Sequence, residues 1–294
     1  MLFSFKNVQG AIMLEDDIRL NVEIALKEDL GGISDPNCDV SAQLIPEDAE
    51  SEASVITRES GIFCGEKWVE EIIRQLGGKV EITWFTKDGE AVKAGQELFH
   101  LKGNTRIMTT AERTILNFIQ MLSGVATVVS AYVKELEGTS CSLFDTRKSI
   151  PGLRTALKYA VACGGGKNHR IGLFDMFFIK EIHIAAAGGI TQAILKAREI
   201  APDKKIDILV ANLDELKEAL AAKADIIMLH NFDYAQIEEA AAVNNHQAKL
   251  EISGNVNLET IGKFAQSGVD YISVGALTKH ITALEVYMRF VKKS

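Results

Sequence analysis

The sequence predicts an α/β protein in which an N-terminal α/β sandwich domain precedes an incomplete parallel α/β barrel. The chain has 294 residues, enough for one large domain or two ordinary ones. Its first part mixes helical and strand patterns irregularly. From about residue 140, six short apolar runs are each followed by a helical pattern, which is typical of parallel strands joined by right-handed crossovers.

The N-terminal elements follow from hydrophobic spacing and from glycines that end helices. Residues 18–32 repeat apolar positions as a helix does and end at Gly31 and Gly32, and residues 67–78 also end in two glycines. Residues 52–60 and 79–89 alternate as half-buried strands do. A threonine-capped helix over 108–124 leads into a further predicted helix over 124–137.

Six apolar runs after residue 140 are the predicted barrel strands. They cover residues 141–145, 176–180, 206–211, 226–230, 250–253 and 271–275. We therefore place the sandwich domain at 1–125, the barrel at 126–280, and a C-terminal helix that packs back on the first domain at 281–294. Active sites of such barrels lie at the carboxyl ends of the strands, so those ends are the candidate site.

Composition and charge limit the classes of function. Hydrophobic residues make up 47% and charged residues 24%, as in soluble globular proteins, and the net charge of -8 argues against nucleic-acid binding. We expect no membrane span and no leader, because no apolar run approaches 18 residues. The four cysteines are far apart without a CxxC spacing, which predicts reduced thiols in a cytoplasmic protein and no zinc site. These cysteines are Cys38, Cys64, Cys141 and Cys163.

Basic side chains nevertheless gather at the first two predicted strand ends. They are Arg147, Lys148, His169, Arg170 and Lys180. Arginine suits bidentate recognition of carboxylate or phosphate, and lysine supplies a point charge. One such residue alone is more often a surface charge, but clustering at successive strand ends predicts a pocket for a multiply charged anion. The three glycines at 164–166 lack the spacing of a P-loop, and His183 and His280 are typical of capping or core residues.

Long motifs carry a resemblance to a known family. DTRKSIPGLRTALKYAVACGGGKNHRIGLFD over residues 145–175 is followed by IKEIH, ADIIMLHNF, LEISGNV and ISVGALTKH, and ALKEDLGG, ITRESGIFCG and AERTILNFIQMLSG occur earlier. In this order they resemble quinolinate phosphoribosyltransferase, also called nicotinate-nucleotide pyrophosphorylase (carboxylating). The resemblance covers nearly the whole chain.

The resemblance implies a reaction, an assembly and a set of site residues. The family transfers the phosphoribosyl group of PRPP to quinolinate, with Mg²⁺ on PRPP, and yields nicotinate mononucleotide, pyrophosphate and CO₂ for NAD synthesis. It works as a homodimer, and Arg113 matches an arginine that enters the neighbouring subunit's site. Lys148 and Lys180 match catalytic positions. Residues that match substrate contacts or phosphate loops are Arg147, His169, Arg170, Ser253, Gly254, Asn255, Gly275 and Ala276.

The chain departs from the family pattern at its acids. The third barrel strand of the family reads like V-E-V-E-V-E-N, whereas residues 206–212 read IDILVAN, so that Leu209 and Ala211 replace acids. The family's M-L-D-N-F ends here in Met-Leu-His-Asn-Phe, with His230 for the second metal-associated acid. Magnesium prefers oxygen ligands and imidazole suits other metals better, so we expect no protein-ligated Mg²⁺ at Leu209 and His230.

These replacements predict weakened or lost catalysis with the anion pocket retained. Two alternatives stay open at this stage. Neighbouring acids (Asp207, Asp175 or Glu251) could compensate in an active enzyme with a rewired metal site. The chain could also be a non-catalytic binding or regulatory subunit that pairs with an active paralogue.

Overall fold

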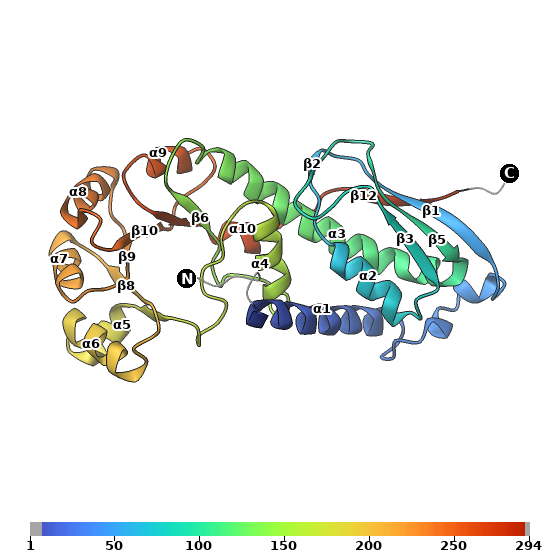
Figure 1. Cartoon of the computed structure of the whole chain (residues 1–294), viewed down its shortest axis with the longest axis horizontal. Coiled ribbons are helices and arrows are strands. Elements are labelled where there is room, and N and C mark those ends of the chain that lie inside the picture. The colour runs from blue at the N-terminus through green and yellow to red at the C-terminus, as the bar shows by residue number, and fades with distance from the viewer. Residues whose placement is uncertain (1–7, 292–294) are drawn as a thin grey trace. The chain divides into compact units, whose positions relative to one another are not determined.

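The protein divides into two compact units in a computed structural model that describes residues 8–291 and the side chains of 13–291 (Figure 1). Within the described residues, the barrel unit comprises residues 131–148 and 166–276. The sandwich unit comprises residues 8–130, 149–165 and 277–291. The two units are described separately below.

The sandwich unit contains a four-stranded antiparallel sheet in the order β12-β1-β5-β3. Its strands are β1 (Glu50–Thr57), β3 (Val80–Trp84), β5 (Glu97–Asn104) and β12 (Val286–Phe290), and β2 (Gly61–Ile62) pairs separately with β4 (Ala91–Val92). Its helices are α1 (Val8–Asp29), α2 (Glu66–Gln75), α4 (Arg154–Cys163) and most of α3 (Thr105–Lys134), with short 3₁₀ turns at Pro36–Cys38 and Ala42–Leu44. The strands predicted over 52–60 and 79–89 are therefore confirmed as β1 and β3.

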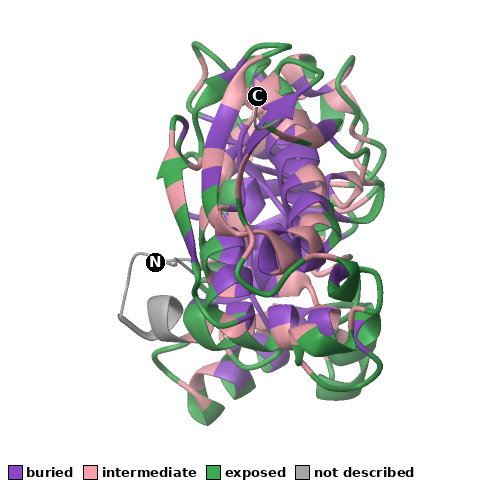
Figure 2. Ribbon diagram, turned by 90° about the vertical axis from the view of Figure 1, so that its right-hand side faces the viewer, coloured by how far each residue is buried: buried purple, intermediate pink, exposed green. Residues whose placement is uncertain are grey.

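Aromatic side chains fill the core of the sandwich unit. Phe63, Trp68 and Phe99 are fully buried. The Trp84 ring lies 4.6 Å from that of Phe99, and the Trp68 ring lies 5.5 Å from that of Tyr159, so the sheet and the helices share one apolar interior. Buried residues, purple in Figure 2, follow the inner faces of strands and helices, whereas the loops are largely exposed.

Helix α3 is continuous where the sequence predicted two helices meeting near residue 124. Gly124 does not end this helix. The glycine instead allows close packing, since a Cβ there would lie 2.0 Å from the carbonyl oxygen of Thr282. By length and composition α3 could cross a membrane, but 61% of its most apolar window is buried, and core helices of soluble proteins pass the same test. We therefore interpret α3 as a core helix.

The C-terminal segment forms a strand, and the prediction of a helix over 281–294 was wrong for residues 281–291; residues 292–294 lie outside the described residues. Strand β12 pairs antiparallel with β1, with Val286 opposite Thr57 and Phe290 opposite Ala53. The exposed edge of β1 has backbone groups that need partners, and the β-branched and aromatic residues of β12 suit that place. Tertiary pairing has overridden the weak helical pattern.

The barrel unit is a six-stranded parallel sheet in the order β6-β11-β10-β9-β8-β7. Its strands are β6 (Ser142–Phe144), β7 (Phe177–Ile179), β8 (Ile206–Val210), β9 (Ile226–Leu229), β10 (Lys249–Ser253) and β11 (Tyr271–Ser273). Its helices are α5 (Glu181–Ala187), α6 (Ile190–Ile200), α7 (Leu213–Ala221), α8 (Tyr234–Asn244) and α9 (Ile261–Ala265), and α10 (Ala276–Lys279) follows β11 in the chain. All six predicted strands are confirmed.

This strand order is that of a barrel left open between its first two strands. The first strand, β6, pairs with the last, β11, while β6 and β7 are the two edges of the sheet. Helices α5 to α9 lie outside the curved sheet (Figure 1). The described fold thus agrees with the predicted incomplete parallel barrel.

Replacing Gly124 by alanine tests the close approach between α3 and residue Thr282. We expect Gly124→Ala to lower the free energy of unfolding by about 1–3 kcal/mol, because a methyl group has no room beside that carbonyl. Gly262→Ala on α9 is the control, since its Cβ would come no nearer than 3.4 Å to another atom. Urea unfolding of both variants measures the difference, and equal stabilities would contradict the packing argument.

Candidate functional site

The predicted site residues of the barrel unit lie at or beside the carboxyl ends of its strands. Arg147 and Lys148 follow β6, Lys180 follows β7, His230 follows β9, Ser253 ends β10 with Gly254 and Asn255 after it, and Gly275 and Ala276 follow β11. Alternation along a strand places residues two apart on the same face. Asp207, Leu209 and Ala211 on β8 therefore face one side, and the register pairs Leu209 with Met228 on β9.

The ends of β6 and β11 meet closely. Thr146 Oγ1 accepts the backbone N–H of Lys148 at 3.1 Å, and a Cβ at Gly275 would lie 2.9 Å from Cδ of Lys148. Glycine at 275 thus makes room for the Lys148 side chain. After β10, Gly254 and Asn255 have φ of 94° and 53°, and successive left-handed residues of this kind can turn backbone N–H groups toward an anion.

A segment at the open edge of the sheet positions His169 and Arg170. The backbone N–H of Lys167 donates to the carbonyl of Leu143 on β6 at 2.8 Å, so this segment runs beside β6 in place of a neighbouring strand. The buried Asp145 then accepts the backbone N–H of His169 at 2.9 Å and the side-chain amide of Asn168 at 2.7 Å. The Asp145 carboxylate thereby holds the segment at the end of β6.

His169 is bound to two buried carboxylates. Its Nε2 lies 3.2 Å from Asp207 Oδ2 and 3.2 Å from Glu251 Oε2, and both acids are fully buried. Burial alone would lower the pKa of His169, but the charges and hydrogen bonds of Glu251 and Asp207 outweigh it and raise the pKa to about 10. Burial, together with the Glu251 charge, raises the pKa of Asp207.

The other ring nitrogen of His169 faces the backbone. The N–H of Arg170 lies 2.8 Å from Nδ1, a contact that favours a neutral ring protonated at Nε2. A hydrogen bond between neutral groups contributes about 0.5–1.5 kcal/mol, less than one that involves a charge. The two carboxylates at Nε2 therefore outweigh the backbone contact at Nδ1. Whether the ring is neutral or charged, Nε2 carries a proton directed at Asp207 and Glu251.

The remaining cations surround the ring of Phe178 on β7. The guanidinium carbon of Arg170 lies 5.1 Å from the ring centroid and Nζ of Lys180 lies 5.4 Å from it, both within cation–π range. Burial and the charge of Arg147 lower the pKa of Arg170, so the two guanidinium groups lie close enough to repel each other. Arg147 Nε is buried without a hydrogen-bond partner in the described structure. Asp175 and Asp207 balance part of the charge on Arg170.

The opposite wall is apolar where acids were missing from the sequence. Leu209 and Met228 are each 7% exposed. Nε2 of His230 lies 4.0 Å from a carboxylate oxygen of the exposed Glu181. Asp207 and Glu251 lie deeper, and Glu251 also accepts the hydroxyl of Ser273. Leu209, Met228 and His230 offer no oxygen atom of their side chains and so do not fit Mg²⁺, which prefers oxygen ligands.

His183, Arg113 and Phe178 remain to be placed. Nδ1 of His183 accepts the backbone N–H of Lys180 at 3.0 Å, which caps α5, as expected for a structural histidine. Arg113 is exposed on α3 in the sandwich unit, so its predicted entry into a neighbouring site stays a prediction. Phe178 was missed, because an aromatic residue inside a predicted strand is typical of core packing.

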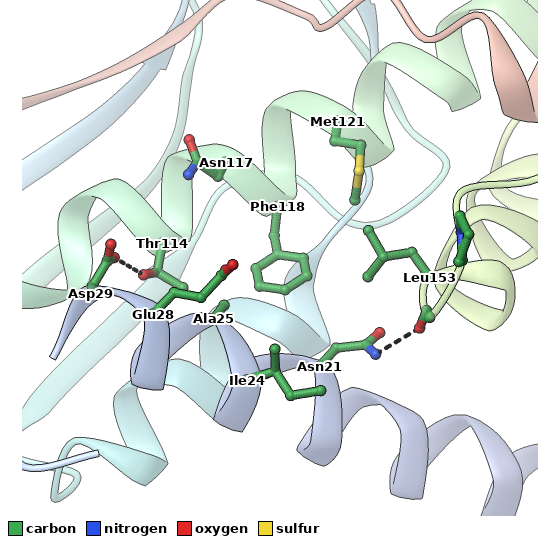
Figure 3. Close-up of a pocket in the computed structure, with 12 residues that line it drawn as sticks. Asn21, Ile24, Ala25, Glu28, Asp29, Thr114, Asn117, Phe118, Met121 and Leu153 are labelled. Carbon is green, nitrogen blue, oxygen red and sulfur yellow. Dashed lines mark hydrogen bonds between the residues drawn. The ribbon is translucent and has the colours of Figure 1, made fainter. Parts of the chain in front are cut away.

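The sandwich unit contains a pocket of about 420 Å³ (Figure 3). Helices α1 and α3 and the loop 151–153 line it. Asn21 Nδ2 donates to the carbonyl of Gly152 at 3.1 Å, and Thr114 Oγ1 donates to Asp29 Oδ2 at 3.0 Å. Glu28 and Asp29 make this pocket unsuited to an anion.

Most of both units matches the domains of one known protein family. Residues 39–123 match the N-terminal domain of quinolinate phosphoribosyl transferase, and residues 125–289 match its C-terminal domain. The chain belongs to the quinolinate phosphoribosyltransferase family. The fold class predicted from the sequence is confirmed, because solved members of this family share the two-domain arrangement of a parallel and an antiparallel sheet.

Individual relatives agree with this assignment. A solved nicotinate-nucleotide pyrophosphorylase from Francisella tularensis is 48% identical, with 94% of this chain and 97% of that chain covered and a TM-score of 0.90. A probable nicotinate-nucleotide pyrophosphorylase (carboxylating) of Bacillus subtilis is 38% identical over 85% of this chain and 87% of its own. A chloroplastic enzyme of that name from Arabidopsis thaliana is 37% identical over 93% of this chain and 82% of its own. The family therefore indicates a phosphoribosyltransferase of NAD biosynthesis.

The His169 cluster predicts a pH dependence of stability. A raised histidine pKa contributes stability that is complete below the unfolded value of about 6.5 and is lost as pH rises toward 10. Glu251→Gln removes one of the charges that raise the pKa of His169, so this pKa is raised less in the variant. The difference in free energy of unfolding between parent and variant should therefore shrink from pH 6.5 to pH 10. Urea unfolding at several pH values measures it. A difference that stays constant with pH would contradict the charged cluster.

Proposed function

We propose that this chain binds quinolinate and PRPP at the mouth of its barrel and catalyses phosphoribosyl transfer only weakly or not at all. The observation that carries the proposal is the contrast between the two walls of the mouth. Arg147, Arg170 and Lys180 form a wall with excess positive charge, and Leu209 and Met228 form an apolar wall. The first binds anions, and the second lacks the oxygen ligands that the family resemblance implies.

The cationic wall fits a planar dicarboxylate. Arg147 and Arg170 can each hold a carboxylate with two parallel hydrogen bonds, and Lys180 adds a point charge. A bound dianion would also relieve the repulsion between the two guanidinium groups. The apolar face of Phe178 lies among these cations, where it can support an aromatic ring. This chemistry supports quinolinate as the ligand.

The loops after β10 and β11 suit the phosphate groups of PRPP. Gly254, Asn255, Gly275 and Ala276 carry no bulky side chain that would block their backbone N–H groups, and Ser253 supplies a hydroxyl. Lys148, whose stem passes close to Gly275, is the cation that can reach both ligands. Its role is to orient the reacting groups and to balance their charge.

Weak catalysis follows from where the remaining acids lie. Positive charge develops on the ribose as pyrophosphate leaves, and acids at positions 209 and 230 would stabilise it. Asp207 and Glu251 are fully buried and hydrogen-bonded to His169, so they do not replace those acids. Compensation by Asp207 or Glu251 would therefore require breaking the His169 cluster. Asp175 Oδ2 accepts the backbone N–H of Ile171 at 2.6 Å, and Asp175 Oδ1 is buried.

The assembly and the compartment are also proposals. We infer a homodimer in which Arg113, exposed on α3, enters the site of a second copy, as the family resemblance implies. The four cysteines are free, which supports a reducing compartment such as the cytoplasm. The printed names of some plant relatives place those proteins in mitochondria or chloroplasts.

Removing one guanidinium group tests the anion pocket. Arg147→Ala should weaken quinolinate binding, measured by calorimetry, by about 10- to 100-fold, because a charged hydrogen bond contributes about 1.5–3 kcal/mol. Lys196→Ala is the control: Lys196 is exposed on α6 and pairs only with Glu199, at 3.1 Å, in the described structure. Equal affinities in the two variants would rule out this pocket.

Restoring the acids tests the catalytic defect. The double variant Leu209→Glu with His230→Asp should raise kcat/KM for nicotinate mononucleotide formation by about 10³-fold with PRPP and Mg²⁺, since metal assistance contributes several kcal/mol. Quinolinate affinity should stay unchanged. Leu209→Gln with His230→Asn keeps the size without the charge and should not restore the rate. A parent already as fast as the double variant would instead establish an active enzyme with a rewired site.

A further inference from the structure

Two cysteines that are distant in sequence meet a carboxylate inside the sandwich unit. Cys64 is fully buried just before α2, Cys163 is half-buried at the end of α4, and Asp88 lies in the turn between β3 and β4. One ligand atom from each lies within 4.8 Å of the other two. Nothing in the transferase reaction described above uses these three groups.

Neighbouring groups fix the orientation of Asp88. Oδ1 accepts the backbone N–H of Gly65 at 2.6 Å and that of Glu66 at 3.1 Å, and Oδ2 accepts the hydroxyl of Tyr159 at 2.8 Å. A carboxylate has about four lone-pair sites, so these three bonds leave one free. The Asp88 turn also packs against α4, because a Cβ at Gly89 would lie 3.3 Å from the carbonyl oxygen of Cys163.

Acidic groups lie near the Cys64 thiol, and Lys67 is a cation near Asp88. Burial and the nearby Cys163, Asp88 and Glu66 raise the pKa of the Cys64 thiol, and burial raises the pKa of Asp88. The three hydrogen bonds to the Asp88 carboxylate come from neutral donors. A raised thiol pKa lowers the thiolate fraction and hence reactivity toward oxidants. A divalent cation would balance these charges directly.

We propose that Cys64, Asp88 and Cys163 form a binding site for a thiophilic divalent metal ion of the zinc class. Two thiolate sulfurs and one carboxylate oxygen are ligands that Zn²⁺ prefers, and water completes a tetrahedron. Each thiol gives up its proton when the metal–sulfur bond forms, so one ion releases two protons and nothing is oxidised or reduced. The ion joins the start of α2, the β3–β4 turn and the end of α4.

The geometry requires only a small contraction. Zinc–sulfur bonds of about 2.3 Å place two tetrahedral sulfur ligands roughly 3.8 Å apart, so donors within 4.8 Å of one another must approach by about 1 Å. Cys163 is half-buried and offers the route from solvent, whereas Cys64 is fully enclosed. The hydrogen bond from Tyr159 to Asp88 orients the carboxylate, as neighbours of metal ligands do.

Cobalt titration of the full-length reduced protein tests the site. We expect one Co²⁺ per chain, a near-ultraviolet sulfur-to-cobalt band and the strong visible bands of tetrahedral Co²⁺, all abolished by added Zn²⁺. Cys163→Ser and Asp88→Asn should weaken Co²⁺ binding by about 100-fold or more, because each removes one of three protein ligands. Asp88→Asn keeps an oxygen that accepts the N–H groups of Gly65 and Glu66, which favours correct folding.

Two matched controls separate this site from the other thiols. Cys141→Ser removes a buried cysteine and Cys38→Ser an exposed one, and both should leave the cobalt spectrum unchanged. In the parent protein, Zn²⁺ should protect the half-buried Cys163 from iodoacetamide, as shown by peptide mass spectrometry, which requires no variant to fold. The proposal fails if no sulfur-to-cobalt band forms, or if the band survives in Cys163→Ser.

Discussion

The arrangement of the barrel mouth depends on the hydrogen bonds between His169 and the carboxylates of Asp207 and Glu251. They commit the two buried acids to the interior of the barrel unit. A charged group in such a place must be paired, since an uncompensated buried charge costs several kcal/mol. Held in this way, both acids lie two or more residues before the carboxyl ends of β8 and β10. At the strand ends themselves, Leu209 and His230 supply no carboxylate oxygen.

Most of the barrel unit could be predicted because its signals are local. Six apolar runs that alternate with helical segments indicate parallel strands, and the carboxyl ends of such strands meet at one mouth. Arg147, Lys148 and Lys180 accordingly follow β6 and β7. The partners of His169 could not be predicted, because Asp207 and Glu251 reach it across three separate segments. Phe178 was missed because its contacts with the cations depend on side-chain geometry.

Errors in the sandwich unit have a common physical origin in tertiary contacts. Gly124 resembles a helix end in sequence, yet in α3 it makes room for the backbone at Thr282. Residues after 281 resemble a helix, yet β12 completes the sheet by pairing with β1. Cysteine spacing likewise could not show that Cys64 and Cys163 lie together, which the fold brings about. In each case a partner far away in sequence decides the local outcome.

The position of β12 has a consequence for synthesis of the chain on the ribosome. The barrel unit has all six of its strands once residue 273 has been translated. The antiparallel sheet still lacks the strand beside β1, since β12 follows every strand of the barrel unit in the chain and is translated after them. During translation the edge of β1 is therefore open to pairing with other nascent chains, a known route to misassembly. Emergence of β12 from the ribosome is thus the event that protects this edge.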